Sequence, residues 1–536
     1  MILEILLPFP INKTFSYLAR DELEKKNDPR VGSLVEVEFN SKKSVGLVVK
    51  INRKKSICRP LKKINRLLNP FILSLEIIES INFIADYSCN KRSMILKLFL
   101  SGFPKKIAKF ETNKKNLKKK ELKSNTLNLE QKIIVSKINN IKPEQFNVVL
   151  LEGVTGSGKT RVYMNKVKKL IESGVQCLVL VPEIILTTEW VREIKRDFDL
   201  NPVVYHSSIK RKEREKIWAL INTNQIKFVI GTRSALFLPF YKLGLIVVDE
   251  EHDSSYKQEE QTIINARDFS IVRAMNSHCM VILSSATPSL ESFHNVKLNK
   301  FRHFRLTKRV NNKNTPIIET IDMKKQKNLI SDQLCKKIER NLFNNHQTLI
   351  FINKRGYAPL VICKKCGHSR TCENCNTSLV LHNLKTKSSA YLLCHHCNYK
   401  EIFENLCKNC KSQSSFEFPG LGIEKISEQI SNLFPDARKC VLSSDTMNKE
   451  LNLKTIVPQI ISNDIDIIIG TQLVSKGHNF PFLKTVGILN VDYLLNDFDF
   501  RSFEKTFQQI IQVGGRAGRK NLNGEIVIQT MQPEHK

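Results

Sequence analysis

EGVTGSGKT, residues 152–160, follows a strand-like apolar run and precedes the helix-forming segment RVYMNKVKKLIE (161–172). A glycine-rich loop between a strand and a helix is the context of a phosphate-binding loop, because backbone N–H groups at the helix N-terminus can face the phosphates. The stretch therefore predicts an α/β domain that binds a nucleoside triphosphate. The predicted contacts are Gly153, Thr155, Gly156, Ser157, Gly158, Lys159 and Thr160.

Two side chains of this loop have predicted roles, and a second motif completes them. We expect Lys159 to reach the β- and γ-phosphates and the Thr160 hydroxyl to hold Mg²⁺. LIVVDEEH (245–252) supplies the acidic residues that such a site needs. Asp249 ends a strand-like run, where its carboxylate can face the metal, and Glu250 is placed to polarise the attacking water. The alternative is that these carboxylates only cap a helix.

Continuous runs of Val, Ile and Leu alternate with helix-length segments through most of the chain. This alternation is typical of a parallel sheet that is covered on both faces. It occurs twice, so we expect a first α/β lobe over 128–308 and a second lobe that begins over 309–361 and resumes over 413–536.

Two arginines close the second lobe, in QVGGRAGR (512–519). Arg516 and Arg519 fall on one helical face if the segment is helical, and their guanidinium groups could meet a γ-phosphate across a cleft. A turn with solvated charge is the alternative.

Cysteine spacing predicts metal binding within residues 362–412. Of the 14 cysteines, eight form four Cys-x-x-Cys pairs there. Eight thiolates fit two tetrahedral Cys₄ zinc sites, which would be structural because they leave no open position. The spacing does not fix which pairs share an ion, and His368, His395 and His396 are less favoured ligands. The predicted ligands are Cys363, Cys366, Cys372, Cys375, Cys394, Cys397, Cys407 and Cys410.

The first part of the chain differs in composition. Residues 1–100 contain alternating stretches with Gly32 and Gly46 at expected turns, which indicates a small β-rich domain. Residues 101–127 are rich in lysine and are predicted to be a solvated basic linker.

The net charge and the length of the apolar runs restrict the classes of partner and the cellular compartment that we expect. Lys and Arg number 85 against 52 Asp and Glu, a formal net charge of +33, which favours nucleic acid as a partner unless the excess only reflects a drift in base composition. The N-terminus lacks a basic leader, and the apolar runs are strand-length. We therefore expect a cytoplasmic protein with no membrane partner.

Further motifs run through residues 128–536: LVPEIILT, IGTRSALF, VVDEEHDSSYKQEE, SSATPSLE, FINKRGYAP, GTQLVSKGHNFP and DFRSFEKTFQQI. With these, the phosphate-binding loop, the cysteine pairs and QVGGRAGR, the chain resembles the PriA family of bacterial replication restart helicases (primosomal protein N′), in helicase superfamily 2.

The resemblance implies two RecA-like lobes, a zinc-binding insertion in the second lobe and an N-terminal domain that binds the 3′ end of DNA. It implies an ATP-dependent DNA helicase that translocates 3′ to 5′, uses ATP, Mg²⁺ and two Zn²⁺, and assembles the primosome at stalled forks. The implied partners are forked or single-stranded DNA, primosome proteins and single-strand-binding protein. We expect a monomer.

The resemblance also implies residue roles. Gln131 is expected to recognise adenine, and Arg233 and Lys476 are expected to line the DNA path or couple it to ATP. The outer two cysteine pairs are expected to share one zinc ion, and the inner two the other.

Some segments depart from the family pattern. Ser16 stands where the family has Asp, and QTIIN (261–265) replaces an aromatic-rich loop that is thought to couple DNA to hydrolysis. The linker is expected to be too short for the family's winged-helix domain, and the family continues beyond the last residue. The alternative function is therefore a DNA-binding primosome scaffold with a slow or uncoupled ATPase; an RNA helicase is a third possibility.

Overall fold

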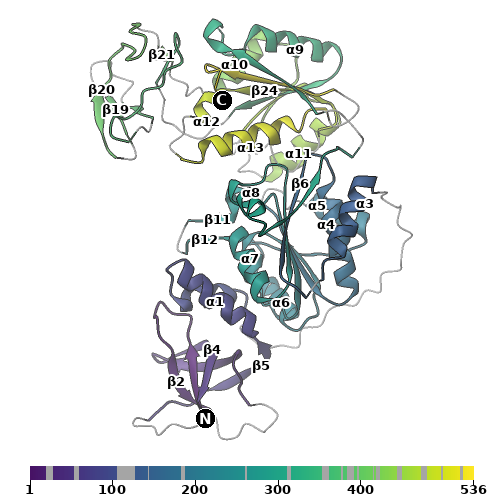
Figure 1. Ribbon diagram of the computed structural model, residues 1–536, viewed down its shortest axis with the longest axis vertical. Coiled ribbons are helices and arrows are strands. Elements are labelled where there is room, and N and C mark those ends of the chain that lie inside the picture. Colours follow the sequence, from purple (N-terminus) through teal and green to yellow (C-terminus); the bar gives the residue numbers. More distant parts are fainter. Residues whose placement is uncertain are drawn as a thin grey trace. The chain divides into compact units, whose positions relative to one another are not determined.

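The computed structural model (Figure 1) forms two compact units, residues 1–153 with 157–307 and residues 154–156 with 308–536. The residues that the structure describes are 1–19, 28–52, 60–104, 127–142, 144–182, 188–259, 262–310, 315–326, 328–352, 361–375, 378–382, 391–394, 397–413, 416–417, 423–442, 450–471, 480–495, 499–518 and 523–535. Most of the predicted basic linker lies outside them. The predicted domain boundaries stay predictions.

The N-terminal domain is built on an antiparallel sheet, as the alternating stretches predict. Its strands, in spatial order, are β2 (Phe15–Leu18), β1 (Ile2–Leu6), β4 (Lys42–Asn52), β3 (Ser33–Phe39) and β5 (Arg66–Ile72).

The positions of the turns in this sheet were predicted only in part. Gly32 lies at a turn with φ of +92°. Gly46 does not, because it lies inside β4, where an added Cβ would come within 2.3 Å of Ile5 Cγ2. The β3–β4 hairpin instead turns at Asn40 and Ser41, which both have positive φ, as a two-residue hairpin loop requires. The turn predicted at Gly46 is therefore wrong: that glycine permits close packing.

Two helices follow the sheet, α1 (Leu75–Tyr87) and α2 (Arg92–Phe99), and they pack on the first lobe. The Trp218 indole donates a hydrogen bond to the Phe99 carbonyl (2.8 Å) and meets the Phe71 and Phe103 rings edge to face. The buried Arg273 guanidinium lies between the Phe99 and Phe240 rings, 5.5 and 5.3 Å from their centroids. One apolar core thus joins the N-terminal domain to the first lobe.

The first lobe is a seven-stranded sheet in which every adjacent pair is parallel. In spatial order the strands are β14 (Arg302–Leu306), β6 (Asn147–Gly153), β13 (Met280–Ser285), β10 (Leu243–Asp249), β7 (Gln176–Leu180), β9 (Phe228–Gly231) and β8 (Val203–Tyr205). The helices are α3 (Leu129–Asn139), α4 (Lys159–Glu172), α5 (Thr188–Phe198), α6 (Arg211–Asn222), α7 (Ala266–Asn276) and α8 (Leu290–Lys297).

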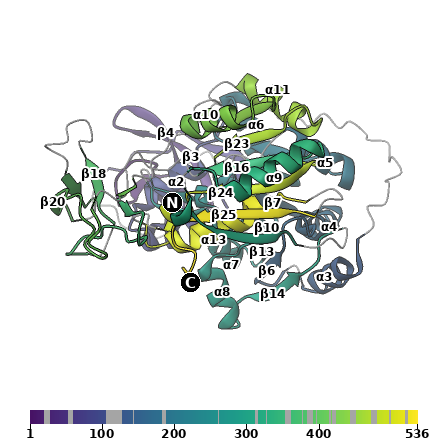
Figure 2. The same cartoon turned by 90° about the horizontal axis from the view of Figure 1, so that it is seen from above.

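Alternate residues of these strands face two different cores. In β6, Val149 and Leu151 pack with α3, α4 and α5, whereas Val148 and Leu150 face the core that contains α6, α7 and the N-terminal helices. Helices α3 and α4 lie side by side in both views (Figure 1 and Figure 2). Both faces are covered, which explains why the strands are apolar throughout.

The second lobe repeats this architecture with a six-stranded parallel sheet, which confirms the predicted fold class. Its strands, in spatial order, are β15 (Ile317–Asp322), β25 (Glu525–Thr530), β24 (Leu483–Leu489), β16 (Gln347–Ile352), β23 (Ile467–Gly470) and β22 (Lys439–Leu442). Its helices are α9 (Asp332–Phe343), α10 (Ile423–Leu433), α11 (Glu450–Ile461), α12 (Val491–Leu495) and α13 (Ser502–Gly514).

The cysteine-rich insertion of the second lobe has only short strands. They are β17 (Ile362–Cys363), which pairs with β21 (Phe416–Glu417), and the antiparallel set β18 (Val380–His382), β19 (Tyr391–Leu393) and β20 (Lys400–Ile402). Along the described residues, no helix combines the length and apolar composition that crossing a membrane requires.

The contact of Trp218 with α2 yields a stability prediction. Trp218→Ala should lower the free energy of unfolding of the first unit by about 3–5 kcal/mol, because it leaves a cavity between α2 and α6. Trp218→Phe should cost only about 1 kcal/mol, because it mainly removes the hydrogen bond to the Phe99 carbonyl. Guanidinium unfolding followed by circular dichroism measures both. Equal losses for the two variants would contradict the packing argument.

Candidate functional site

The phosphate-binding loop connects β6 to α4, as predicted. Gly156 and Gly158 both have φ of +80°, a left-handed conformation that only glycine adopts without strain. The side chain of Lys159 folds back over the loop, and its Nζ donates to the Gly153 carbonyl at 2.8 Å. Lys159 is 9% exposed, so its ammonium group is held against the loop.

Gln131 lies next to this loop although it belongs to α3. Its Nε2 donates to the Ser157 carbonyl at 2.7 Å, and its Oε1 accepts from the Asn128 N–H at 3.0 Å. Asn128 Oδ1 in turn accepts from the Gln131 N–H, which completes a capping box at the start of α3. The expected adenine-recognising residue is thus fully buried and bonded to the loop.

Asp249 lies at the carboxyl end of β10, where the sequence placed it. Its Oδ1 accepts from the Ser284 hydroxyl at 2.8 Å and its Oδ2 from the Tyr163 hydroxyl at 3.1 Å. Burial, together with the nearby charge of Glu250, raises the pKa of Asp249 to about 6, although the Ser284 hydrogen bond and the Lys159 charge oppose the rise. A carboxylate this close to the loop is suited to a divalent cation.

Glu250 has a strained backbone, with φ of +48° at a residue that is not glycine. Its Oε2 lies 3.8 Å from His252 Nδ1, and that same nitrogen is 2.7 Å from the Ser285 hydroxyl of β13. Backbone strain of this kind is often found at functional sites. The arrangement links Glu250 to the end of the neighbouring strand.

The next acidic residue, Glu251, has contacts that the sequence does not predict. Glu251 is 2% exposed and accepts from the Ser289 N–H at 2.6 Å and from the Ser289 and Ser292 hydroxyls at 3.0 and 3.1 Å. Arg267 Nη1 lies 3.4 Å away. Glu251 therefore holds the start of α8 against the end of β10. The SSATPSLE motif contains Ser289, but nothing in the sequence identifies Glu251 as its partner.

Of the four other predicted residues, the structure describes Arg233 and Arg516. Arg233 is exposed and its Nη1 donates to the Lys257 carbonyl at 3.0 Å, just after the acidic motif. Arg516 follows α13 in the second unit and is 6% exposed. Arg519 and Lys476 lie outside the described residues. Their predicted roles stay predictions.

The eight paired cysteines form two tetrads. Cys363, Cys366, Cys407 and Cys410 make one, and Cys372, Cys375, Cys394 and Cys397 make the other, with all sulfurs of a tetrad within 4.8 Å of one another. This grouping is the one that the resemblance implies. Among the described residues no histidine joins either group, and His395 and His396 lie outside them.

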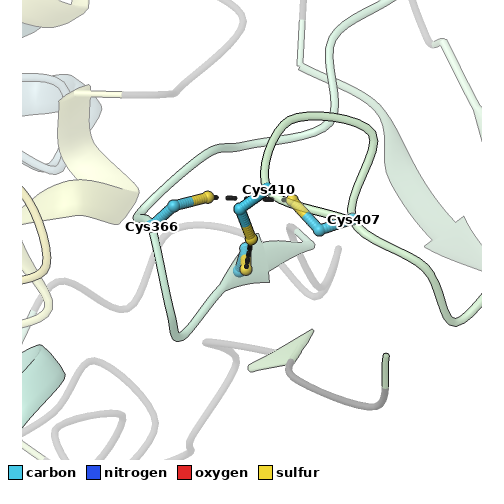
Figure 3. Close-up of side chains that lie close together, drawn as sticks. Cys366, Cys407 and Cys410 are labelled. Carbon is cyan, nitrogen blue, oxygen red and sulfur yellow. Dashed lines mark hydrogen bonds between the residues drawn. The ribbon is translucent and has the colours of Figure 1, made fainter. Parts of the chain in front are cut away.

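The sulfur separations fit zinc. Cys366 faces Cys407 at 3.7 Å (Figure 3). Cys363 lies 3.6 Å from Cys410. The second tetrad has separations of 3.5–3.8 Å. Four sulfurs around one zinc at about 2.3 Å would be about 3.8 Å apart in a tetrahedron. A disulfide would need a separation of about 2.05 Å. Both tetrads therefore have the donor set and spacing of a structural zinc site.

Ser16 also has a defined partner. Its hydroxyl donates to Glu4 Oε1 at 3.0 Å, and Thr14 Oγ1 donates to Glu4 Oε2 at 3.1 Å, across the β1–β2 pair. A carboxylate is therefore present beside position 16, although it is contributed by the neighbouring strand.

The tetrads predict the metal content. Purified under reducing conditions, the protein should contain two zinc ions per chain, and Cys363→Ser should retain one, because each tetrad is complete without the other. Atomic absorption measures this, with Cys335→Ser, outside both tetrads, as the control. Finding one ion or none in the unmodified protein would contradict the two-site assignment.

Two family models match parts of the chain. A family described as DEAD/DEAH box helicase matches residues 131–296, and a family described as 3′DNA-binding domain matches residues 4–101. The replication restart protein PriA of Rickettsia conorii is 38% identical over 100% of this chain and 81% of its own length. The proteins of that name from Haemophilus influenzae and Bacillus subtilis are 39% and 37% identical over 76% and 73% of this chain, and over 56% and 49% of their own lengths. The chain therefore belongs to the PriA family of replication restart proteins.

Proposed function

We propose that this protein is an ATP-dependent DNA helicase that translocates 3′ to 5′ and acts in replication restart and primosome assembly at stalled forks. The observation that carries the proposal is the position of three groups at the carboxyl ends of the central strands of the first-lobe sheet. They are the loop with Lys159, the buried Asp249, and Glu250 with its strained backbone. Family membership supports DNA as the substrate.

The residues of this edge have distinct roles in the proposed hydrolysis. Loop N–H groups and Lys159 bind and orient the phosphates, and Glu250 polarises the attacking water. Asp249 and Thr160 are placed to hold Mg²⁺, which would neutralise the charge that develops on the phosphates. We also propose that Arg516 and Arg519 act in hydrolysis by binding the γ-phosphate.

The same proposal covers the partners. The N-terminal domain would bind the 3′ end of DNA, and the net charge of +33 would attract forked or single-stranded DNA. The zinc-binding insertion would contact primosome proteins or single-strand-binding protein. We propose a monomer in the cytoplasm.

A second candidate function is a DNA-binding scaffold whose ATPase is slow or uncoupled. The observation in its favour is the segment between β11 (Lys257–Gln258) and β12 (Ile264–Asn265), where Ile263 is 61% exposed and the sequence has no aromatic residue. Base stacking on aromatic rings contributes roughly 1–3 kcal/mol per base in single-strand binders. Its loss would weaken the coupling of DNA to hydrolysis.

Substitution of the loop lysine tests the proposed ATP hydrolysis. Lys159→Ala should reduce the ATPase rate to below about 1% of the unmodified rate, because it removes a preorganised charge from the phosphates. DNA affinity should change less than about twofold, since most phosphate contacts to DNA lie elsewhere. Hydrolysis is measured with forked DNA, with RNA and without nucleic acid.

Lys169→Ala, an exposed lysine on the same helix, is the control and should leave the rate unchanged. An unchanged ATPase rate in Lys159→Ala would refute the proposed ATP-dependent helicase. Hydrolysis that DNA does not stimulate would favour the scaffold, and stimulation by RNA alone would favour an RNA helicase.

Position 16 predicts weak recognition of a free 3′ end. Because Ser16 replaces an acidic residue, binding should be mainly electrostatic, and each phosphate contact should contribute roughly 0.9 to the slope of log affinity against log salt. We expect little preference for a fork with a 3′ hydroxyl over one with a 3′ phosphate. Titration of both DNAs across a salt series measures it. A preference above about tenfold that persists at high salt would show that Glu4 or another group reads the end.

A further inference from the structure

Helix α3 is fastened to the nucleotide-binding loop at its N-terminal end. Gln131 connects it to the Ser157 carbonyl at 2.7 Å, and the capping box with Asn128 fixes the first turn. Ser157 belongs to the nucleotide-binding loop, so this bond fixes the position of Gln131 relative to the loop.

The other end of α3 is held by a buried lysine. Lys166, on α4, is 2% exposed, and its Nζ donates to the carbonyls of Ile138, Asn139 and Ile141 at 3.2, 3.4 and 3.2 Å. The last carbonyls of a helix have no intrahelical donor, so the ammonium group satisfies them and also neutralises the negative end of the helix dipole.

Burying an ammonium group is unfavourable, and desolvation lowers the pKa of Lys166. An apolar side chain would fill the same space without that penalty. The three carbonyl contacts explain how the charge is tolerated, and a second link, from Asn139 Nδ2 to Asn165 Oδ1 at 3.2 Å, runs along the same seam. Helix α3 is thus anchored at both ends to one continuous segment, the loop and α4.

The Gln131 side chain is fully buried beside the loop, and two of its hydrogen-bonding groups are not used by the described residues. One N–H of Nε2 is used by the Ser157 carbonyl, and one lone pair of Oε1 by the Asn128 N–H. One donor and one acceptor remain. This pair complements N7 and the N6 amino group of adenine, the pairing that Asn and Gln make with that base in nucleic acids.

We infer that Lys166 is a positioning residue for base selection: by fixing the C-terminal end of α3 on α4, it keeps Gln131 where it can distinguish adenine from other bases. The inference rests on the proposed ATPase function and on the expected recognition of adenine by Gln131. Lys166 touches neither the loop nor the base. It acts through the position of α3, and a purely structural cap would affect every nucleotide alike.

The test compares ATP with UTP, a triphosphate that lacks adenine. In Lys166→Met the KM for ATP should rise about five- to tenfold, while kcat and the KM for UTP stay within about twofold of the unmodified protein. Lys169→Met, on the exposed side of α4, is the matched control and should change neither constant. In a Gln131→Ala background, Lys166→Met should raise the KM for ATP no further, because the residue through which it acts is absent.

Equal changes for ATP and UTP, an unchanged KM for ATP, or a full effect of Lys166→Met in the Gln131→Ala background would each overturn the inference. If Lys166→Met does not fold, Asn165→Ala decides, since it weakens the same seam and should raise the KM for ATP alone, by about twofold. No ATP hydrolysis by the unmodified protein would instead refute the proposed function, and the inference with it.

Discussion

The hydrogen bond between the Ser284 hydroxyl and Asp249, at 2.8 Å, depends on the register of two parallel strands, β10 and β13. Asp249 of β10 lies opposite Ser284 of β13, and the next residue, Ser285, lies opposite Glu152 of β6. The carboxyl ends of these strands therefore meet at one edge, where the loop begins. A shift of one residue in either pair would turn the polar groups to the other face of the sheet. The candidate nucleotide site is a consequence of this register.

Most of the fold could be predicted because the central strands are apolar on both faces. Two edge strands, β14 and β15, lack the continuous apolar run that marks the central strands. β14 reads Arg-His-Phe-Arg-Leu, and its His303 and Arg305 side chains pair with Glu152 at 2.8 and 3.2 Å. β15 starts with Ile317 and Ile318 exposed. An edge strand with one open side can be polar, so it lacks the apolar run that identifies a buried strand.

The candidate site could also be predicted only in part from the sequence. Lys159 and Asp249 lie in local motifs with fixed spacing, and the structure places both at one sheet edge. Lys166, Tyr163 and Glu251 could not be identified, because their partners are set by packing between distant segments. Lys166 lies on α4 after the loop motif but belongs to no motif itself, and an amphipathic helix usually exposes its lysines. Only the three carbonyls at the end of α3 explain its burial.

In the cysteine-rich insertion, by contrast, the sequence predicts the site better than the packing does. Among its described residues the strands are two or three residues long, and the buried cluster has nine members, of which four are cysteines. So few apolar side chains cannot offset the entropy of ordering the chain. Metal–thiolate bonds can, because a structural zinc site contributes folding free energy directly. Where a core is too small to specify a structure, the metal ligands must specify it. Their spacing can be read directly from the sequence, which is why the cysteine pairs predict this site so clearly.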